Sequence, residues 1–111
     1  MAHSYARAAL DLNSNSNVTL YTCPTGSETI VKSLIVSNDD TSNTCNITVT
    51  LVNSSSAIFS LFKDKQIAAK GTEDLLANST LVLNAGDIIK VQAENADDLH
   101  VVLSYLSVTL L

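Results

Sequence analysis

The sequence predicts an all-β protein, built as a single jelly-roll-like β-sandwich of seven or eight strands. Short runs rich in Val, Ile, Leu and Thr recur along the chain. Turn-forming residues separate these runs at intervals of about 8–12 residues. No segment carries a long helical periodicity, and no internal repeat is present. The 111 residues leave room for one domain with one core.

The last predicted strand, residues 100–111, is the most apolar stretch of the chain. Both alternating sets of positions carry apolar side chains, namely Val101, Leu103 and Tyr105 on one face and Val102, Leu106, Val108 and Leu110 on the other. A strand with only one buried face would alternate between apolar and polar residues. We therefore expect a central strand, covered on its second face either by its own subunit or by a neighbouring copy.

The first 16 residues are predicted to be an N-terminal arm and linker, and residues 17–111 the sandwich domain. Residues 6–10 would suit a helical turn, but the segment is too short to hold a helix alone. The Asn/Ser tract at 13–17 is typical of a loop. Three arrangements of the arm are consistent with the sequence: it packs on its own subunit, it reaches a neighbouring subunit, or it is a frayed terminus.

The next strands are predicted at residues 18–22, 28–37 and 45–51. Strict alternation would place Ile30, Leu34 and Val36 on one face of the second of these strands, together with Lys32, and Val31 and Ile35 on the other. Residues 45–51 alternate most cleanly. Their expected core residues are Cys45, Ile47, Val49 and Leu51, with Asn46, Thr48 and Thr50 facing solvent.

The second half of the chain contains the least certain stretch, residues 63–76. We expect a turn at 63–65 and a helical turn at 72–76, in which Thr72 is the N-cap and two acids occupy the first turn. The remaining strands are expected at 57–62, 79–83 and 87–93, with 66–70 as a further candidate for an edge strand.

The low charge of the chain limits its partners. Only 15% of residues are charged, against about 25% in an ordinary soluble domain, so Ser, Thr and Asn must supply the polar surface. Such a composition suits a protein that packs into an assembly, and equally an ordinary all-β domain. The net charge is −5 and the six basic residues are spread singly, so neither nucleic acid nor an anionic membrane is predicted as a partner.

No targeting or membrane-spanning segment is predicted. The start of the chain lacks the apolar region of a secretory signal, and the longest apolar run is far too short to cross a bilayer. We expect synthesis in a cytoplasm, where Cys23 and Cys45 are more consistent with free thiols than with a disulfide. The N-x-S/T sequences at Asn17, Asn46, Asn53 and Asn78 are attributed to composition.

The residues provide little support for catalysis, so we predict no enzyme activity, catalytic residue, cofactor or metal. His3 and His100 are the only histidines, and no Ser–His–acid order or nucleophile elbow accompanies them. His100 near Asp97 and Asp98 is a weak metal candidate, less favoured than a solvated loop edge. The acidic loops at 39–40 and 94–98 could share a cation between subunits, but they lack an EF-hand spacing.

Two segments resemble a known group of proteins. Residues 21–38, Y-T-C-P-T-G-S-E-T-I-V-K-S-L-I-V-S-N, and residues 81–93, L-V-L-N-A-G-D-I-I-K-V-Q-A, are followed by the closing V-V-L-S-Y-L. This pattern resembles small virion structural proteins of tailed bacteriophages, especially marine and cyanobacterial phages, over residues 21–106. The resemblance implies a β-sandwich virion component, such as a decoration protein, a neck or tail accessory or a fibre-associated module. It brings no catalytic motif and no functional residue.

The resulting hypothesis is an accessory structural protein of a phage particle, first of all a capsid decoration or cement protein. It would be made in the host cytoplasm, form a homo-oligomer with a trimer as one arrangement, and bind the major capsid or other virion proteins. The expected contact residues are Tyr5, Leu10, Leu12, Val102, Leu106, Val108 and Leu110. The alternatives are a neck, tail or fibre component, and a host-surface carbohydrate-binding module that would use loops 38–44 and 94–98. A small hydrolase is the least favoured.

Overall fold

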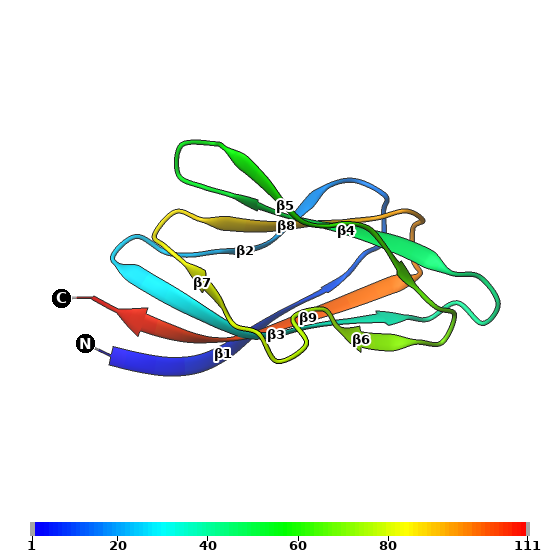
Figure 1. The fold of residues 1–111 in the computed structure, drawn as a ribbon, viewed down its shortest axis with the longest axis horizontal. Coiled ribbons are helices and arrows are strands. Elements are labelled where there is room, and N and C mark those ends of the chain that lie inside the picture. Colours follow the sequence, from blue (N-terminus) through cyan, green and yellow to red (C-terminus); the bar gives the residue numbers. More distant parts are fainter. Residues whose placement is uncertain (1, 111) are drawn as a thin grey trace.

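The computed structural model describes residues 2–110, which form nine strands in two antiparallel sheets packed face to face (Figure 1). The predicted all-β sandwich is confirmed, with nine strands where seven or eight were expected. Met1 and Leu111, the outer ends of the predicted arm and last strand, lie outside the described residues. The molecule is elongated, with extents of 49 × 26 × 21 Å. Within residues 2–110 there is no helix able to cross a membrane.

Sheet A contains the two ends of the described chain side by side. Its order is β1–β9–β3–β6, and β7 also pairs with β3. The strands are β1 (Ala2–Asp11), β3 (Ser27–Asn38), β6 (Thr72–Asp74), β7 (Leu81–Leu83) and β9 (Leu99–Thr109). Strand β9 lies between β1 and β3 over almost its whole length, so the prediction of a central last strand is confirmed.

Sheet B has the order β2–β8–β4–β5. The strands are β2 (Val18–Thr22), β4 (Cys45–Val52), β5 (Ile58–Ile67) and β8 (Ile88–Ala93). β2 has the predicted bounds, and β4 buries the predicted Cys45, Ile47 and Val49 while Leu51 remains partly buried. The turn of the β4–β5 hairpin lies at the upper left of Figure 1, farther from sheet A than β8.

The core lies between the two sheets and is almost entirely aliphatic. The largest fully buried side chains are Val31, Val36, Ile47, Val49, Ile67, Leu83, Ile89, Val91, Leu99, Val101 and Leu103. Thr29 is the buried polar exception among them, and it has hydrogen-bond partners in Tyr21 and Cys23. Residues of both sheets contribute, as expected for a sandwich whose inner faces interdigitate.

A β-bulge at Lys32 changes the faces predicted for β3. The register with β9 shifts between Val31 and Ser33, so that Lys32 is the extra residue. Because of this insertion, Val31 and Leu34 both point into the core, although strict alternation would separate them. Ile35 points out instead. The predicted grouping of Ile30 with Leu34 is therefore wrong.

Residues 2–11 form a strand, and the helical turn considered for residues 6–10 is not present. β1 pairs with β9 over ten consecutive positions, from Ala2 opposite Thr109 to Asp11 opposite His100. An isolated helical turn makes few hydrogen bonds and loses much conformational entropy. Pairing with β9 instead gives β1 a hydrogen bond at every position that faces β9.

The stretch 63–76 also differs from its prediction. Residues 63–65 continue β5 instead of forming a turn, and the irregular register there is accommodated at Asp64, whose φ is 50°. Residues 72–74 form β6 instead of a helical turn. The Asp74 carboxylate accepts hydrogen bonds from the backbone N–H groups of Leu34 (3.1 Å) and Leu76 (3.1 Å), which attaches this segment to β3.

Candidate functional site

The outer face of sheet A carries a row of apolar side chains that crosses four strands. In the strand registers, Tyr5 lies opposite Leu106, Leu106 opposite Ile30, and Ile30 opposite Val82. Directly opposite residues of antiparallel strands point to the same face. Tyr5 is 79% exposed and Val82 57% exposed at the two ends of the row, while Leu106 and Ile30 are partly buried between them.

A second apolar row lies four residues further along β1 and β9, and five residues further along β3 because of the bulge at Lys32. It consists of Ala9 opposite Val102 and Val102 opposite Ile35, which is 38% exposed. Between the two rows lies a polar row, made of Arg7, Ser104 and Ser33. Because strand residues rise about 3.4 Å each, successive rows on this face are roughly 7 Å apart. Together they form a broad sheet face with apolar stripes.

The outer face of sheet B has a different character. A central row consists of Thr19, Lys90, Thr50 and Ser60, and the next contains Gln92 and Thr48. An apolar row appears only at the hairpin end, where Ile88, Val52 and the 68%-exposed Ile58 lie opposite one another. Extended exposed apolar surface on a soluble protein commonly marks a protein-binding site. The outer face of sheet A is therefore the candidate functional site.

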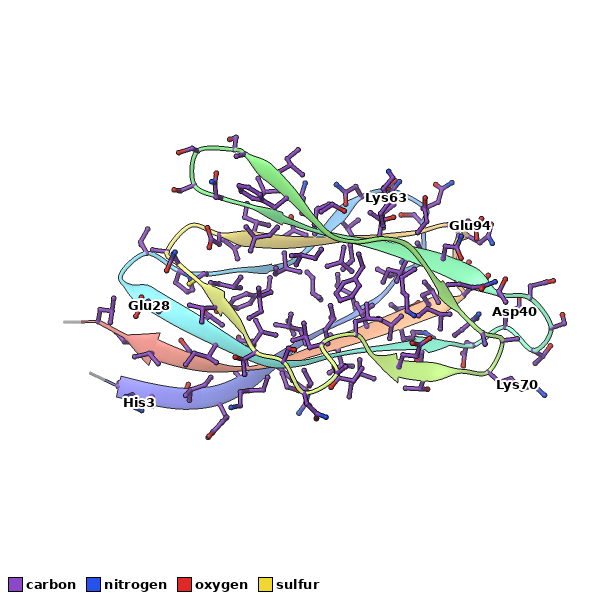
Figure 2. The ribbon with its side chains drawn as sticks, viewed as in Figure 1. His3, Glu28, Asp40, Lys63, Lys70 and Glu94 are labelled. Carbon is purple, nitrogen blue, oxygen red and sulfur yellow. The ribbon has the colours of Figure 1, made fainter. Side chains whose placement is uncertain are left out.

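Ionisable groups lie at both ends of the outer face of sheet A. At one end, His3 and Glu28 lie on either side of Val108 (Figure 2). At the other end, His100 Nε2 lies 3.2 Å from Asp11 Oδ1. The carboxylate partner of His100 thus comes from β1, not from Asp97 or Asp98. Among residues 2–110, no three His, Cys, Asp or Glu side chains gather as a metal site would require.

The structure divides the predicted contact residues into three groups. Tyr5, Val102, Leu106 and Val108 lie on the outer face of sheet A. Leu12 is only 3% exposed and belongs to the core of its own subunit, and Leu10 packs against that core from β1. Neither side chain is presented to a neighbour on this face. Leu110 follows β9 and is exposed.

Sequence reasoning missed three members of the outer face of sheet A, namely Ile30, Ile35 and Val82. The bulge at Lys32 hid the outward position of Ile35, since alternation counted from residue 28 gives the wrong face after the bulge. Val82 faces outward between the inward-facing Leu81 and Leu83, a clear alternation that could have indicated its face.

The loops at 38–44 and 94–98 meet at the end of the sandwich. The Asp39 N–H donates to the Asp98 carbonyl at 2.7 Å. Asp40 Oδ1 accepts hydrogen bonds from the backbone N–H groups of Ser42 and Asn43, and these bonds hold the pKa of the Asp40 carboxyl below its ordinary value. Asp40 and Lys70 lie together at this end (Figure 2), where the Lys70 N–H donates to the Asp40 carbonyl at 3.0 Å.

A polar depression of about 250 Å³ lies on the sheet B side. Its lining is Asn15, Asn46, Thr48, Lys63, Asp64, Gln92, Ala93 and Glu94, which includes no aromatic ring. Lys63 and Glu94 are both seen on this side of the molecule in Figure 2. The lining offers hydrogen-bonding groups but no platform on which a sugar ring could stack.

Both cysteines are free and buried, which confirms the predicted free thiols. Cys23 Sγ accepts a hydrogen bond from Thr29 Oγ1 at 3.3 Å and lies 3.5 Å from the Ser27 carbonyl oxygen. Burial raises the pKa of the Cys45 thiol, an effect that backbone hydrogen bonds from Asn95 and Glu94 partly oppose. Neither thiol is presented as an exposed nucleophile.

Comparison with known proteins shows similarity of fold alone. No protein-family model and no curated protein matches the sequence. A chain from the structure of Bacillus endospore appendages, described as disulfide-linked pili, superposes with a TM-score of 0.62 at 7% identity, covering 99% of this chain and 88% of that one. A chain from the acid-stable capsid of Helicobacter pylori bacteriophage KHP30 gives 0.56 at 15% identity, covering 97% and 88%.

Proposed function

We propose that this protein is an accessory structural component of a bacteriophage particle, acting as a capsid decoration or cement protein through protein–protein adhesion. The observation that carries the proposal is the apolar outer face of sheet A, on which Tyr5, Leu106, Ile30 and Val82 form a continuous row. A monomer that worked alone would have no use for so broad an apolar face.

The fold comparison supports this proposal. A chain from a phage capsid has the same overall fold across nearly its entire length, and so does a chain from bacterial pili. The first of these structures is described as a capsid and the second as pili. The similarity of residues 21–38 and 81–93 to small virion proteins favours the phage particle over other assemblies.

The adhesive mechanism follows from the chemistry of the outer face of sheet A. Burying apolar surface contributes about 25 cal/mol per Å², and a standard interface buries roughly 800 Å² on each partner. Arg7 is the charged residue in the polar row between the two apolar rows, and the exposed Lys32 lies beside that row on β3, so docking brings only these two charged side chains near the centre of the face. The ionisable pairs at both ends of the face can orient the partner. A homo-oligomer would present several such faces together.

Mass spectrometry of purified phage particles tests the proposal directly. The protein should be present in the particle and should remain after washes that remove host proteins. A copy number in the hundreds is expected for a decoration protein on the capsid surface, whereas about a dozen copies or fewer would instead place it at the neck or tail. Absence from the particle would refute the structural role.

A carbohydrate-binding module is the second candidate, favoured by the polar depression that Asn15, Asn46, Gln92 and Glu94 help to line. Side-chain amides and carboxylates are suitable partners for sugar hydroxyls. A glycan array probed with the isolated protein distinguishes the two functions. Specific binding that is lost in the Gln92→Ala variant would favour the sugar-binding function.

A further inference from the structure

Three of the four edges of the sandwich carry features that block the addition of another strand. The β2 edge has a register shift between Thr19 and Tyr21. The β5 edge has irregular register and carries Lys63, Asp64 and Lys65 in succession. The remaining edge of sheet A is made of β6 and β7, each only three residues long. Bulges, charges and short strands are the usual protections of an exposed edge.

The β1 edge has no bulge and is not short, and its only Arg, Lys, Asp or Glu residues are Arg7 and Asp11, which are four residues apart. Its ten residues pair with β9 without a register shift, and it contains neither Pro nor Lys. Residues 2–7 are exposed on both faces, because sheet B does not cover this half of the strand. A long and regular edge strand is a template for pairing with another chain.

The hydrogen bonds identify which backbone groups of β1 are free. The Leu12 N–H donates to the Leu99 carbonyl at 3.0 Å. Leu12 and Leu99 lie directly opposite each other, so they form one of the hydrogen-bonded pairs of the β1–β9 pairing. Since the sets alternate in antiparallel sheets, the even-numbered residues of β1 bond to β9 and the odd-numbered residues point their N–H and C=O groups away from it. The Asp11 carbonyl already accepts from the Asn13 N–H at 2.9 Å. The residues with both groups free are therefore His3, Tyr5, Arg7 and Ala9.

We infer that β1 pairs antiparallel with β1 of a second copy about a two-fold axis at Ala6, which joins the two sheets A into one continuous sheet. The four residues with free backbone groups are arranged symmetrically about Ala6. In this register, His3 lies opposite Ala9 of the second copy and Tyr5 opposite its Arg7. The N–H and C=O groups of His3, Tyr5, Arg7 and Ala9 then all have partners.

Side-chain chemistry favours the same register. Tyr5 is exposed on the outer face, and Arg7 of the second copy would lie beside its ring, where a guanidinium and an aromatic face attract each other. On the inner side, the opposed residues are Ala6 with Ala6 and Ser4 with Ala8, all small. Moving the axis to Arg7 would place two arginines directly opposite and would require the Asp11 carbonyl that Asn13 already occupies.

This inference goes beyond the proposed function, because it concerns the edge of sheet A and a second copy of the chain instead of a virion partner. A dimer joined at β1 would display two outer faces of sheet A side by side. The pairing can hold even if the protein is absent from phage particles, so the two proposals are tested separately.

Site-directed disulfides test the register. In the proposed pairing, the two Ala6 residues form a non-hydrogen-bonded pair with Cα atoms about 4.5 Å apart, within the range for a disulfide. Ala6→Cys should therefore form a covalent dimer under mild oxidation. In the matched control Ala8→Cys, the two cysteines would be separated by four residues along the strands, about 13 Å, and should not cross-link efficiently. The native cysteines are buried and should not contribute.

Light scattering of the unmodified protein, measured over a wide concentration range, should give the mass of a dimer. Ala6→Lys places two like charges opposite each other at the axis and should give a folded monomer, whereas Ser60→Lys, on the far sheet, should remain dimeric. Circular dichroism checks that both variants fold. A strict monomer, a trimer, or equal cross-linking of Ala6→Cys and Ala8→Cys would overturn the inference.

Discussion

The rings of Tyr21 and Tyr105 pack against each other across the sandwich, with centroids 4.4 Å apart and planes inclined by 43°. Tyr21 belongs to β2 of sheet B and Tyr105 to β9 of sheet A, so this contact joins the two layers. The Tyr21 hydroxyl also shares a 2.8 Å hydrogen bond with Thr29 Oγ1 on β3. One side chain thus links an edge strand of sheet B to two strands of sheet A.

Tyr21→Phe should lower the free energy of unfolding by about 1 kcal/mol, because it removes the hydrogen bond to Thr29 and keeps the ring contact. The urea midpoint measures the change. Tyr5→Phe is the matched control, since that exposed hydroxyl has no comparable buried partner and its loss should change stability by less than about 0.5 kcal/mol. Equal effects of the two substitutions would contradict the role of the Tyr21 hydroxyl.

Stability should fall at alkaline pH. Burial raises the pKa of the Cys45 thiol above its ordinary value of 9.0 and that of the Tyr21 hydroxyl above 10.0. Folding therefore favours the protonated forms. Their contribution is complete below pH 9.0 and is lost as the pH rises through the higher pKa values of the folded protein. Denaturant midpoints measured from neutral pH to above pH 10 should show this decline.

The slope of stability against pH identifies the groups responsible. Cys45→Ala should remove the part of the decline that begins just above pH 9.0, and Tyr21→Phe the part that begins above pH 10.0. Each variant is compared with its own stability at neutral pH, so the cost of the substitution itself cancels. An unchanged slope in both variants would show that other groups control the alkaline transition.

Gly86→Ala should destabilise the protein more than Gly26→Ala. Both glycines have positive φ, 86° and 76°, which costs a residue with a Cβ about 1–2 kcal/mol. A Cβ at position 86 would also lie 3.1 Å from Ser54 Cβ, whereas a Cβ at position 26 would meet nothing within 4 Å. Thermal unfolding gives the comparison. Adding Ser54→Gly to Gly86→Ala should recover part of the loss, and no recovery would argue against crowding by Ser54.

The double variant Ile35→Thr/Val82→Thr should weaken attachment to phage particles about tenfold or more, while the subunit stays folded. Both side chains are exposed on the outer face of sheet A, so their replacement removes apolar contact area without opening a core cavity. Ile58→Thr makes the same kind of change on sheet B and should leave attachment unaffected. Cosedimentation with particles that lack the protein measures binding. Equal loss in both variants would exclude the outer face of sheet A as the attachment surface.

Strands with regular alternation could be predicted from the sequence, and the others could not. β2 and the core residues of β4 follow directly from the order of apolar and polar residues. The bulge at Lys32 leaves no mark in that order, because a long Lys side chain is equally acceptable on either face of an edge or bulge position. β5 continues through residues 63–65 because pairing with β4 outweighs the weak strand propensity of Lys and Asp.

The candidate site could be predicted only in part, for a related reason. The apolar content of the last strand predicted a second apolar face, and the structure places Val102, Leu106 and Val108 on the outer face of sheet A, whereas their role as contact residues stays a prediction. The row that includes them requires the strand order and register, which place Tyr5 and Ile30 on either side of Leu106. Long-range pairing of this kind is not encoded in any local pattern.

The central position of β9 has a consequence for the order in which the protein folds. β1 and β3 are connected in sheet A only through β9, which lies between them, and β9 is the last of the described strands to be synthesised. A nascent chain that has reached residue 98 contains every strand of sheet B but cannot complete sheet A. Until β9 is made, β1 has no strand to pair with in sheet A. Its partner lies almost a full chain length away in sequence, and contacts between residues so far apart in sequence make folding slow. On a polysome, many unfinished chains lie close together, each with an unpaired β1. Chaperone binding to the N-terminal residues would therefore protect the chain most before β9 is made.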